Sequence, residues 1–154
     1  QDLHIHDVDL ILSVFGTPNA VVSRGMNIVS AGAPVDHVET SYLYGDMVCT
    51  AQGGWVMPDS VPFEMGYQVL GTKGLLEFSL AKDPALQFYP FDGEPVTPEY
   101  EPGTGYENEL AYFVECLEGG RAPERVTPHS ARESVRIVKA EADSIARREI
   151  VIIG

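Results

Sequence analysis

The sequence is short of basic residues: 10 lysines and arginines stand against 23 aspartates and glutamates among 154 residues. The resulting formal net charge of −13 would repel the phosphate backbone of nucleic acids and the surface of anionic lipids. The sequence also lacks an apolar run of membrane-spanning length and a visible signal peptide. We therefore expect neither a nucleic acid nor a membrane as a partner.

Cysteine is scarce as well. Cys49 lies in a strand-like apolar pattern and Cys116 in a helix-like one, and neither has a CxxC partner or a neighbouring histidine. Such a pattern predicts two buried free thiols in a reducing cytoplasm, with no catalytic role for either. We expect a cytoplasmic protein.

A dinucleotide fingerprint is missing too, because no Gly-x-Gly-x-x-Gly follows a strand pattern anywhere. The stretch Gly71-Thr72-Lys73-Gly74 lacks the spacing of a phosphate-binding loop and precedes a strand pattern, so it is predicted to be a turn. The chain opens at Gln1 without an initiator methionine. We expect a fragment whose preceding part was removed.

What is present is enough for one globular domain. Hydrophobic residues make up 44% of the sequence and charged residues 21%, a balance typical of a folded chain rather than a disordered one. A length of 154 residues supports a real core but not two ordinary domains. We therefore predict a single domain over residues 1–154.

Chemistry-bearing side chains gather at the start of the chain, where residues 2–9 hold two histidines and three aspartates. Apolar residues follow at helical spacing (Ile5, Val8, Leu12, Phe15), and Gly16 precedes a Thr-Pro stop. This spacing predicts a short amphipathic helix over residues 3–15. Asp2 and His6 stand four apart on it, so their side chains can share one space. They form a candidate acid/base pair, because imidazole titrates near neutral pH and a carboxylate can fix its tautomer.

Two other interpretations of this stretch stay open. Asp2 could simply cap the helix, since acidic residues favour helix starts. Alternatively, Asp2-x-His4-x-His6 resembles the first-strand metal motif of amidohydrolases. That motif needs a strand and further ligands in a large barrel, whereas only His37 and His129 remain, both isolated. We expect a surface role for His37 and a capping or solvent role for His129, and we expect no metal.

The rest of the sequence predicts seven strands and two more helices. The strands are expected near residues 20–31, 36–44, 47–56, 64–70, 75–80, 86–91 and 150–153. One helix is expected over residues 106–117, and another from about residue 127 with an apolar side of Val135, Val138, Ala142 and Ile145. This order predicts an α+β fold: an open, largely antiparallel sheet of about six strands with helices packed on one face.

The other sheet face would remain available for oligomerisation. Aromatic residues on the strands are the candidates for a surface that a second subunit would bury (Tyr42, Tyr44, Trp55, Phe78, Phe88 and Tyr89). We expect a homodimer or homotetramer formed through this face.

Several short motifs occur in an order that resembles a known family. They are Asp2-x-x-x-His6 with Asp7 and Asp9, the 42–45 hairpin, Gly53-Gly54-Trp55, the 71–74 turn, the helix over residues 109–119 and Glu141-Ala142 with Ser144. Taken together over nearly the whole chain, they resemble the C-terminal half of the Gfo/Idh/MocA oxidoreductases, the family of glucose-fructose oxidoreductase and inositol dehydrogenase.

The resemblance implies a division of labour between two halves of a larger enzyme. A Rossmann domain, absent from this chain, would bind NAD or NADP and contribute a lysine. His6 would be the general base for the hydroxyl of a sugar or polyol substrate, and Asp2 would bind the substrate or orient His6. His4 stands where a small residue is often found, which implies a narrower or more polar pocket.

The sequence thus predicts the substrate-binding and oligomerisation domain of an NAD(P)-dependent oxidoreductase that acts on a CH–OH group. The isolated chain is expected to be inactive, because the cofactor and the lysine belong to the missing half. The alternatives are a metal-dependent hydrolase that uses the Asp-x-His-x-His motif and a non-catalytic oligomerisation module.

Overall fold

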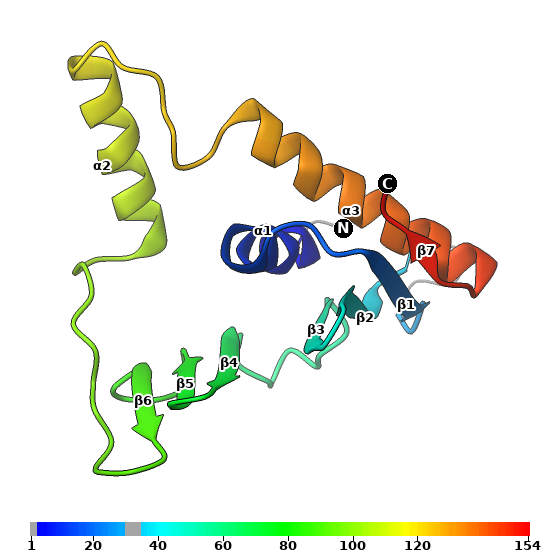
Figure 1. Cartoon of the computed structure of the whole chain (residues 1–154), viewed down its shortest axis with the longest axis horizontal. Coiled ribbons are helices and arrows are strands. Elements are labelled where there is room, and N and C mark those ends of the chain that lie inside the picture. Colours follow the sequence, from blue (N-terminus) through cyan, green and yellow to red (C-terminus); the bar gives the residue numbers. More distant parts are fainter. Residues whose placement is uncertain (1–2, 30–34) are drawn as a thin grey trace. The chain divides into compact units, whose positions relative to one another are not determined.

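A computed structural model describes residues 3–29 and 35–154 of the chain (Figure 1). The helices are α1 (His4–Phe15), α2 (Gly105–Glu118) and α3 (Pro128–Arg147). The strands are β1 (Ala20–Met26), β2 (His37–Tyr44), β3 (Met47–Gly54), β4 (Gly66–Gly71), β5 (Gly74–Ser79), β6 (Leu86–Pro90) and β7 (Val151–Ile152). Every predicted element is found, and the α+β class is confirmed.

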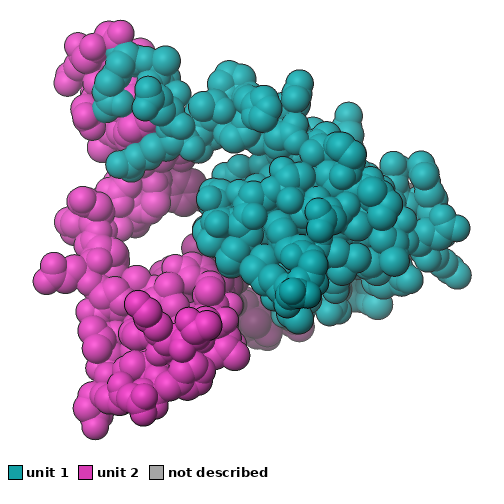
Figure 2. Space-filling model, in the orientation of Figure 1, with its two compact units in different colours: residues 1–57, 121–154 teal, residues 58–120 magenta. Residues whose placement is uncertain are grey.

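The chain divides into two compact units, which Figure 2 shows in different colours. Unit 1 comprises residues 1–57 and 121–154, and unit 2 comprises residues 58–120. The prediction that residues 1–154 act as one substrate-binding and oligomerisation domain stays a prediction.

Unit 1 contains a four-stranded antiparallel sheet in the order β3-β2-β1-β7. The predicted hairpin joins β2 to β3, and Gly45 in its turn has a φ of 74°, which glycine adopts without strain. Both α1 and α3 pack on one face of this sheet (Figure 1). The strands therefore alternate between side chains that face the helices and side chains that face outward.

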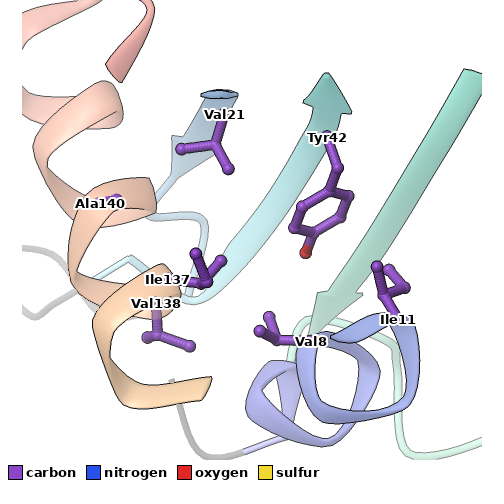
Figure 3. Packing of buried hydrophobic residues seen from close by; sticks show 7 residues of the cluster. All are labelled: Val8, Ile11, Val21, Tyr42, Ile137, Val138 and Ala140. Carbon is purple, nitrogen blue, oxygen red and sulfur yellow. The ribbon is translucent and has the colours of Figure 1, made fainter. Parts of the chain in front are cut away.

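The core of unit 1 lies between that sheet face and the two helices. Its buried side chains come from α1, β1, β2 and α3 (Val8, Ile11, Val21, Tyr42, Ile137, Val138 and Ala140; Figure 3). Tyr42 is only 1% exposed, and its ring extends from β2 into this core. The prediction that Tyr42 and Tyr44 belong to an exposed subunit contact is wrong, because Tyr42 is buried and Tyr44 packs against the same core.

The buried side of α3 is more polar than the sequence predicts. Val135 is exposed, and so is Ala142, whereas Ser134, Glu141 and Ser144 are buried. Each of these three has a partner far away in the sequence: Asp9 for Ser134, Tyr42 for Glu141, and the backbone of Ser23 for Ser144. Apolar periodicity misplaced this face because hydrogen bonds, not only apolar contacts, hold it in the core.

Unit 2 holds a separate three-stranded sheet in the order β4-β5-β6 and the helix α2. The predicted turn at residues 71–74 joins β4 to β5, and Tyr67 stacks on Phe78 across that pair. Thr104 and Glu107 close a capping box at the start of α2. The described strands thus form two sheets, not the single sheet of about six strands that was predicted.

Both cysteines are free, as predicted; Cys116 is buried as predicted, whereas Cys49 is only half-buried. Within residues 3–29 and 35–154, no helix combines the length and the apolar character that crossing a membrane requires.

Candidate functional site

The first turn of α1 directs its two histidines to opposite sides. Residues two apart on a helix lie on different faces, and accordingly His4 is 4% exposed whereas His6 is exposed. The predicted base, His6, is therefore accessible, whereas His4 faces the core. Asp2, the predicted partner of His6, lies outside the described residues.

His4 belongs to a cluster of polar side chains from three elements. Its Nδ1 lies 3.1 Å from Oδ2 of Asp7, one turn further along α1. Its Nε2 lies 3.4 Å from Oε1 of Glu141 on α3 and 3.4 Å from the hydroxyl oxygen of Tyr42 on β2. The Tyr42 hydroxyl donates a hydrogen bond of 2.7 Å to the same Oε1 of Glu141. We call His4, Asp7, Tyr42 and Glu141 the His4 cluster.

The His4 cluster favours the charged form of its histidine. Burial alone would lower the pKa of His4, but the hydrogen bonds to Asp7 and Glu141 and the charges of these carboxylates raise that pKa from 6.5 to about 9. Burial, together with the Glu141 carboxylate, also raises the pKa of Tyr42. At neutral pH, a protonated His4 therefore lies between two carboxylates, with Tyr42 as a neutral hydrogen-bond donor.

Gly53 on β3 leaves room for this cluster. A Cβ at Gly53 would lie 3.3 Å from Oδ2 of Asp7 and 3.3 Å from Nδ1 of His4, which is tighter than most Cβ contacts. The sequence motif Gly53-Gly54-Trp55 thus has a physical role, because the strand backbone approaches the His4–Asp7 pair closely. Sequence reasoning missed the cluster, since its members are separated by up to 137 positions.

The structure bears on the two other interpretations of the first turn, a helix cap at Asp2 and a metal motif. The N-cap position of α1 falls on Leu3, whose side chain cannot cap, and not on Asp2. The amidohydrolase-like metal motif requires a strand that turns both histidines to one side, whereas His4 and His6 point to opposite sides of a helix. The arrangement gives this alternative no support.

His37 lies near the cluster and differs from its prediction as a surface residue. It is half-buried, and its Nδ1 has no hydrogen-bond partner among the residues that the structure describes. His37 and His4 both line a cavity of about 20 Å³, together with Leu3, Gly53 and Trp55. A cavity of this size can hold about one water molecule.

A larger cleft lies at the other end of α1, where this helix meets the start of α3. It has a volume of about 350 Å³ and includes Asp9, Ser13, Arg125 and His129. Asp9 accepts a hydrogen bond of 2.7 Å from Ser134 and so joins α1 to α3. His129 is exposed next to Pro128, the first residue of α3, in agreement with its predicted place at a helix entrance.

Comparisons with known proteins identify the fold of the chain. No protein-family model matches the sequence, and no curated protein matches it. Solved structures do match, and they are structures of oxidoreductases and dehydrogenases. The chain has the fold of a domain that makes up about half of such enzymes, so the predicted resemblance to the C-terminal half of Gfo/Idh/MocA oxidoreductases is confirmed for the fold.

Three of these structures show the extent of the likeness. GenD2 from gentamicin A biosynthesis, in complex with NAD, matches with a TM-score of 0.77 and 22% identity over 99% of this chain and 47% of its own. Aldose-aldose oxidoreductase from Caulobacter crescentus, complexed with glycerol, matches with a TM-score of 0.76 and 19% identity over 97% of this chain and 45% of its own. WlbA dehydrogenase from Bordetella pertussis, in complex with NADH and UDP-GlcNAcA, matches with a TM-score of 0.72 and 15% identity over 99% of this chain and 44% of its own.

Proposed function

We propose that this chain is the substrate-side domain of an NAD(P)-dependent oxidoreductase that acts on a CH–OH group of a sugar, polyol or related compound. The observation that carries the proposal is the fold, which matches oxidoreductases over nearly the whole chain but over only about half of theirs. The other half, a nucleotide-binding domain in the parent protein, would hold the cofactor. The nicotinamide would accept a hydride from the carbinol carbon.

Within this proposal, His6 is the general base. A carbinol carbon releases hydride readily only as its oxygen loses a proton, so a base must lie within hydrogen-bond reach of that oxygen. The exposed position of His6 on α1 leaves its imidazole open to a substrate, whereas His4 is buried in its cluster. Asp2 would bind the substrate or orient the His6 ring.

The test is turnover by the parent protein with a panel of sugars and polyols, followed through the absorbance of reduced nicotinamide. His6→Ala should lower kcat by about 10²- to 10⁴-fold, the usual contribution of a general base, with little change in cofactor affinity. His129→Ala, which removes another exposed histidine of unit 1, is the matched control and should keep kcat near the wild-type value. Equal turnover by wild type and His6→Ala would sink the assignment of His6 as the base.

A titration of the isolated chain separates this proposal from the metal alternative. We expect no binding of NAD(P)H to the chain alone and no stoichiometric binding of zinc. Zinc binding that disappears in His4→Ala or His6→Ala would replace the dehydrogenase proposal with a metal site. Light scattering in the same experiment gives the mass of the assembly, for which we propose a homodimer or homotetramer.

A further inference from the structure

Among the residues that the structure describes, α1 shows no capping box at its start, unlike the other two helices. α2 and α3 each begin with a complete capping box, at Thr104 and at Thr127. α1 begins after Leu3, and no side chain of the N-cap residue accepts a hydrogen bond from its first turn. Helix ends without such partners fray, because their first N–H groups have no intrahelical acceptor.

The His4 cluster supplies contacts at this same turn. His4 is the first residue of α1, and it contacts Glu141 on α3 and Tyr42 on β2 through buried atoms. Glu141 is 2% exposed and Tyr42 is 1% exposed, so both anchors are fixed inside the core. Asp7, also in the first turn of the helix, accepts a hydrogen bond from Nδ1 of His4.

We propose that the His4 cluster is a positioning device: it fixes the first turn of α1 to β2 and α3 and thereby holds His6 in place for proton abstraction. The second half of this statement rests on the proposed function, whereas the first half does not. His4, Tyr42 and Glu141 are positioning residues, since none of them is exposed to a substrate. The rate of proton abstraction would depend closely on the position of His6, because a displacement of about 1 Å in a catalytic group can lower the rate by about 10²-fold.

The contacts of the His4 cluster, which we also call the clamp, depend on the charge of His4 and are therefore sensitive to pH. The groups that face His4 are the carboxylates of Asp7 on α1 and Glu141 on α3 and the hydroxyl of Tyr42 on β2. The segment before β2 and the end of β3 add Asp36, His37 and the backbone of Gly53, which line the small cavity beside His4. The charge of Cys49 on β3 adds to the effects that raise the pKa of Tyr42. Loss of the His4 proton at high pH leaves the two carboxylates without their shared cation.

Hydrogen exchange measured by mass spectrometry tests the clamp without an assay of enzymatic activity. His4→Gln and Glu141→Gln should each speed exchange in peptides that cover residues 4–10 by about tenfold or more, while peptides of α2 exchange as in the wild type. In the wild-type protein, exchange of residues 4–10 should also rise above its intrinsic base-catalysed increase as the pH passes about 9. His129→Gln is the matched control, because it makes the same chemical change at an exposed position.

Unchanged exchange of residues 4–10 in the variants, or in the wild type across this pH range, would overturn the proposal. The wild-type pH series decides the question even if a variant fails to fold. Kinetics of the parent enzyme test the link to His6: His4→Gln should lower kcat by about tenfold or more with KM nearly unchanged. Faster exchange combined with a wild-type kcat would overturn the positioning role. A wild-type parent protein that reduces no nicotinamide would refute the proposed function and leave the exchange result to decide the clamp.

Discussion

At the scale of single residues, the two histidines of α1 have different surroundings although they are only two positions apart. The helical repeat turns His4 into the core and leaves His6 exposed. The sequence predicted the helix and singled out His6, but it could not distinguish a buried His4 from an exposed one. That distinction depends on Tyr42 and Glu141, which only the tertiary fold brings to His4.

Tyr42→Phe should reveal the strength of the buried hydrogen bond at Glu141. The substitution keeps the ring in the core but removes the hydroxyl that donates to Oε1 of Glu141. Leaving a buried charged acceptor without this donor should lower the free energy of unfolding by about 1–3 kcal/mol in urea titrations. Tyr106→Phe, at a tyrosine that is 81% exposed, is the matched control and should change it by less than about 0.5 kcal/mol. A loss of similar size in both variants would contradict the role of the Tyr42 hydroxyl.

The pKa of His4 predicts how stability depends on pH. Because that pKa rises from 6.5 to about 9 on folding, the folded chain binds a proton that the unfolded chain releases between these values. This contribution to stability is fully present below pH 6.5 and is lost as the pH rises through about 9. Urea titrations of the wild type across this pH range should show a falling free energy of unfolding. The His4→Gln variant should show a smaller fall. Identical pH profiles for the two proteins would rule out His4 as the source.

At the scale of elements, the close approach of β3 to α1 depends on a glycine. Gly53→Ala would place a Cβ 3.3 Å from both the Asp7 carboxylate and the His4 ring, so the clamp must shift. We expect this variant to lose about 1–3 kcal/mol of unfolding free energy, the usual cost of overpacking, and to titrate His4 at a lower pH in NMR spectra. At Gly71, at the end of β4, an added Cβ meets no atom within 4 Å, so Gly71→Ala is the control. A wild-type His4 titration in Gly53→Ala would contradict this account.

The elements also show where periodicity succeeds and where it fails. Alternation predicted β2, which buries Thr40 and Tyr42, and the turn at Gly45 predicted its hairpin with β3. The buried face of α3 was predicted only in part: Val138 is in the core, but Glu141 and Ser144 look like surface residues until their partners are known. The start of that helix was predicted closely, because Thr127 with Pro128 is a local signal.

At the scale of the whole molecule, the order of elements predicted the fold class but not the division into two sheets. Hairpins are local, so each of these pairings could be inferred from its turn, whereas the grouping of the strands into two sheets has no local sequence signal. The candidate site was predicted in part: His6 came from a local motif, but the His4 cluster joins residues from three elements, α1, β2 and α3. The cofactor and the substrate belong to the proposed function of a larger protein.

The most direct test of the central claim is the fate of a deuterium label placed on the carbinol carbon of sugar and polyol substrates. We predict that the parent protein transfers the label to NAD or NADP, so that mass spectrometry finds it on the reduced nicotinamide, and that His6→Ala slows this transfer. Because the carbinol hydrogen leaves as a hydride, the label should not exchange with water during the transfer. Product formation with the label retained on carbon or lost to water, and without reduced nicotinamide, would contradict an oxidoreductase function for this domain.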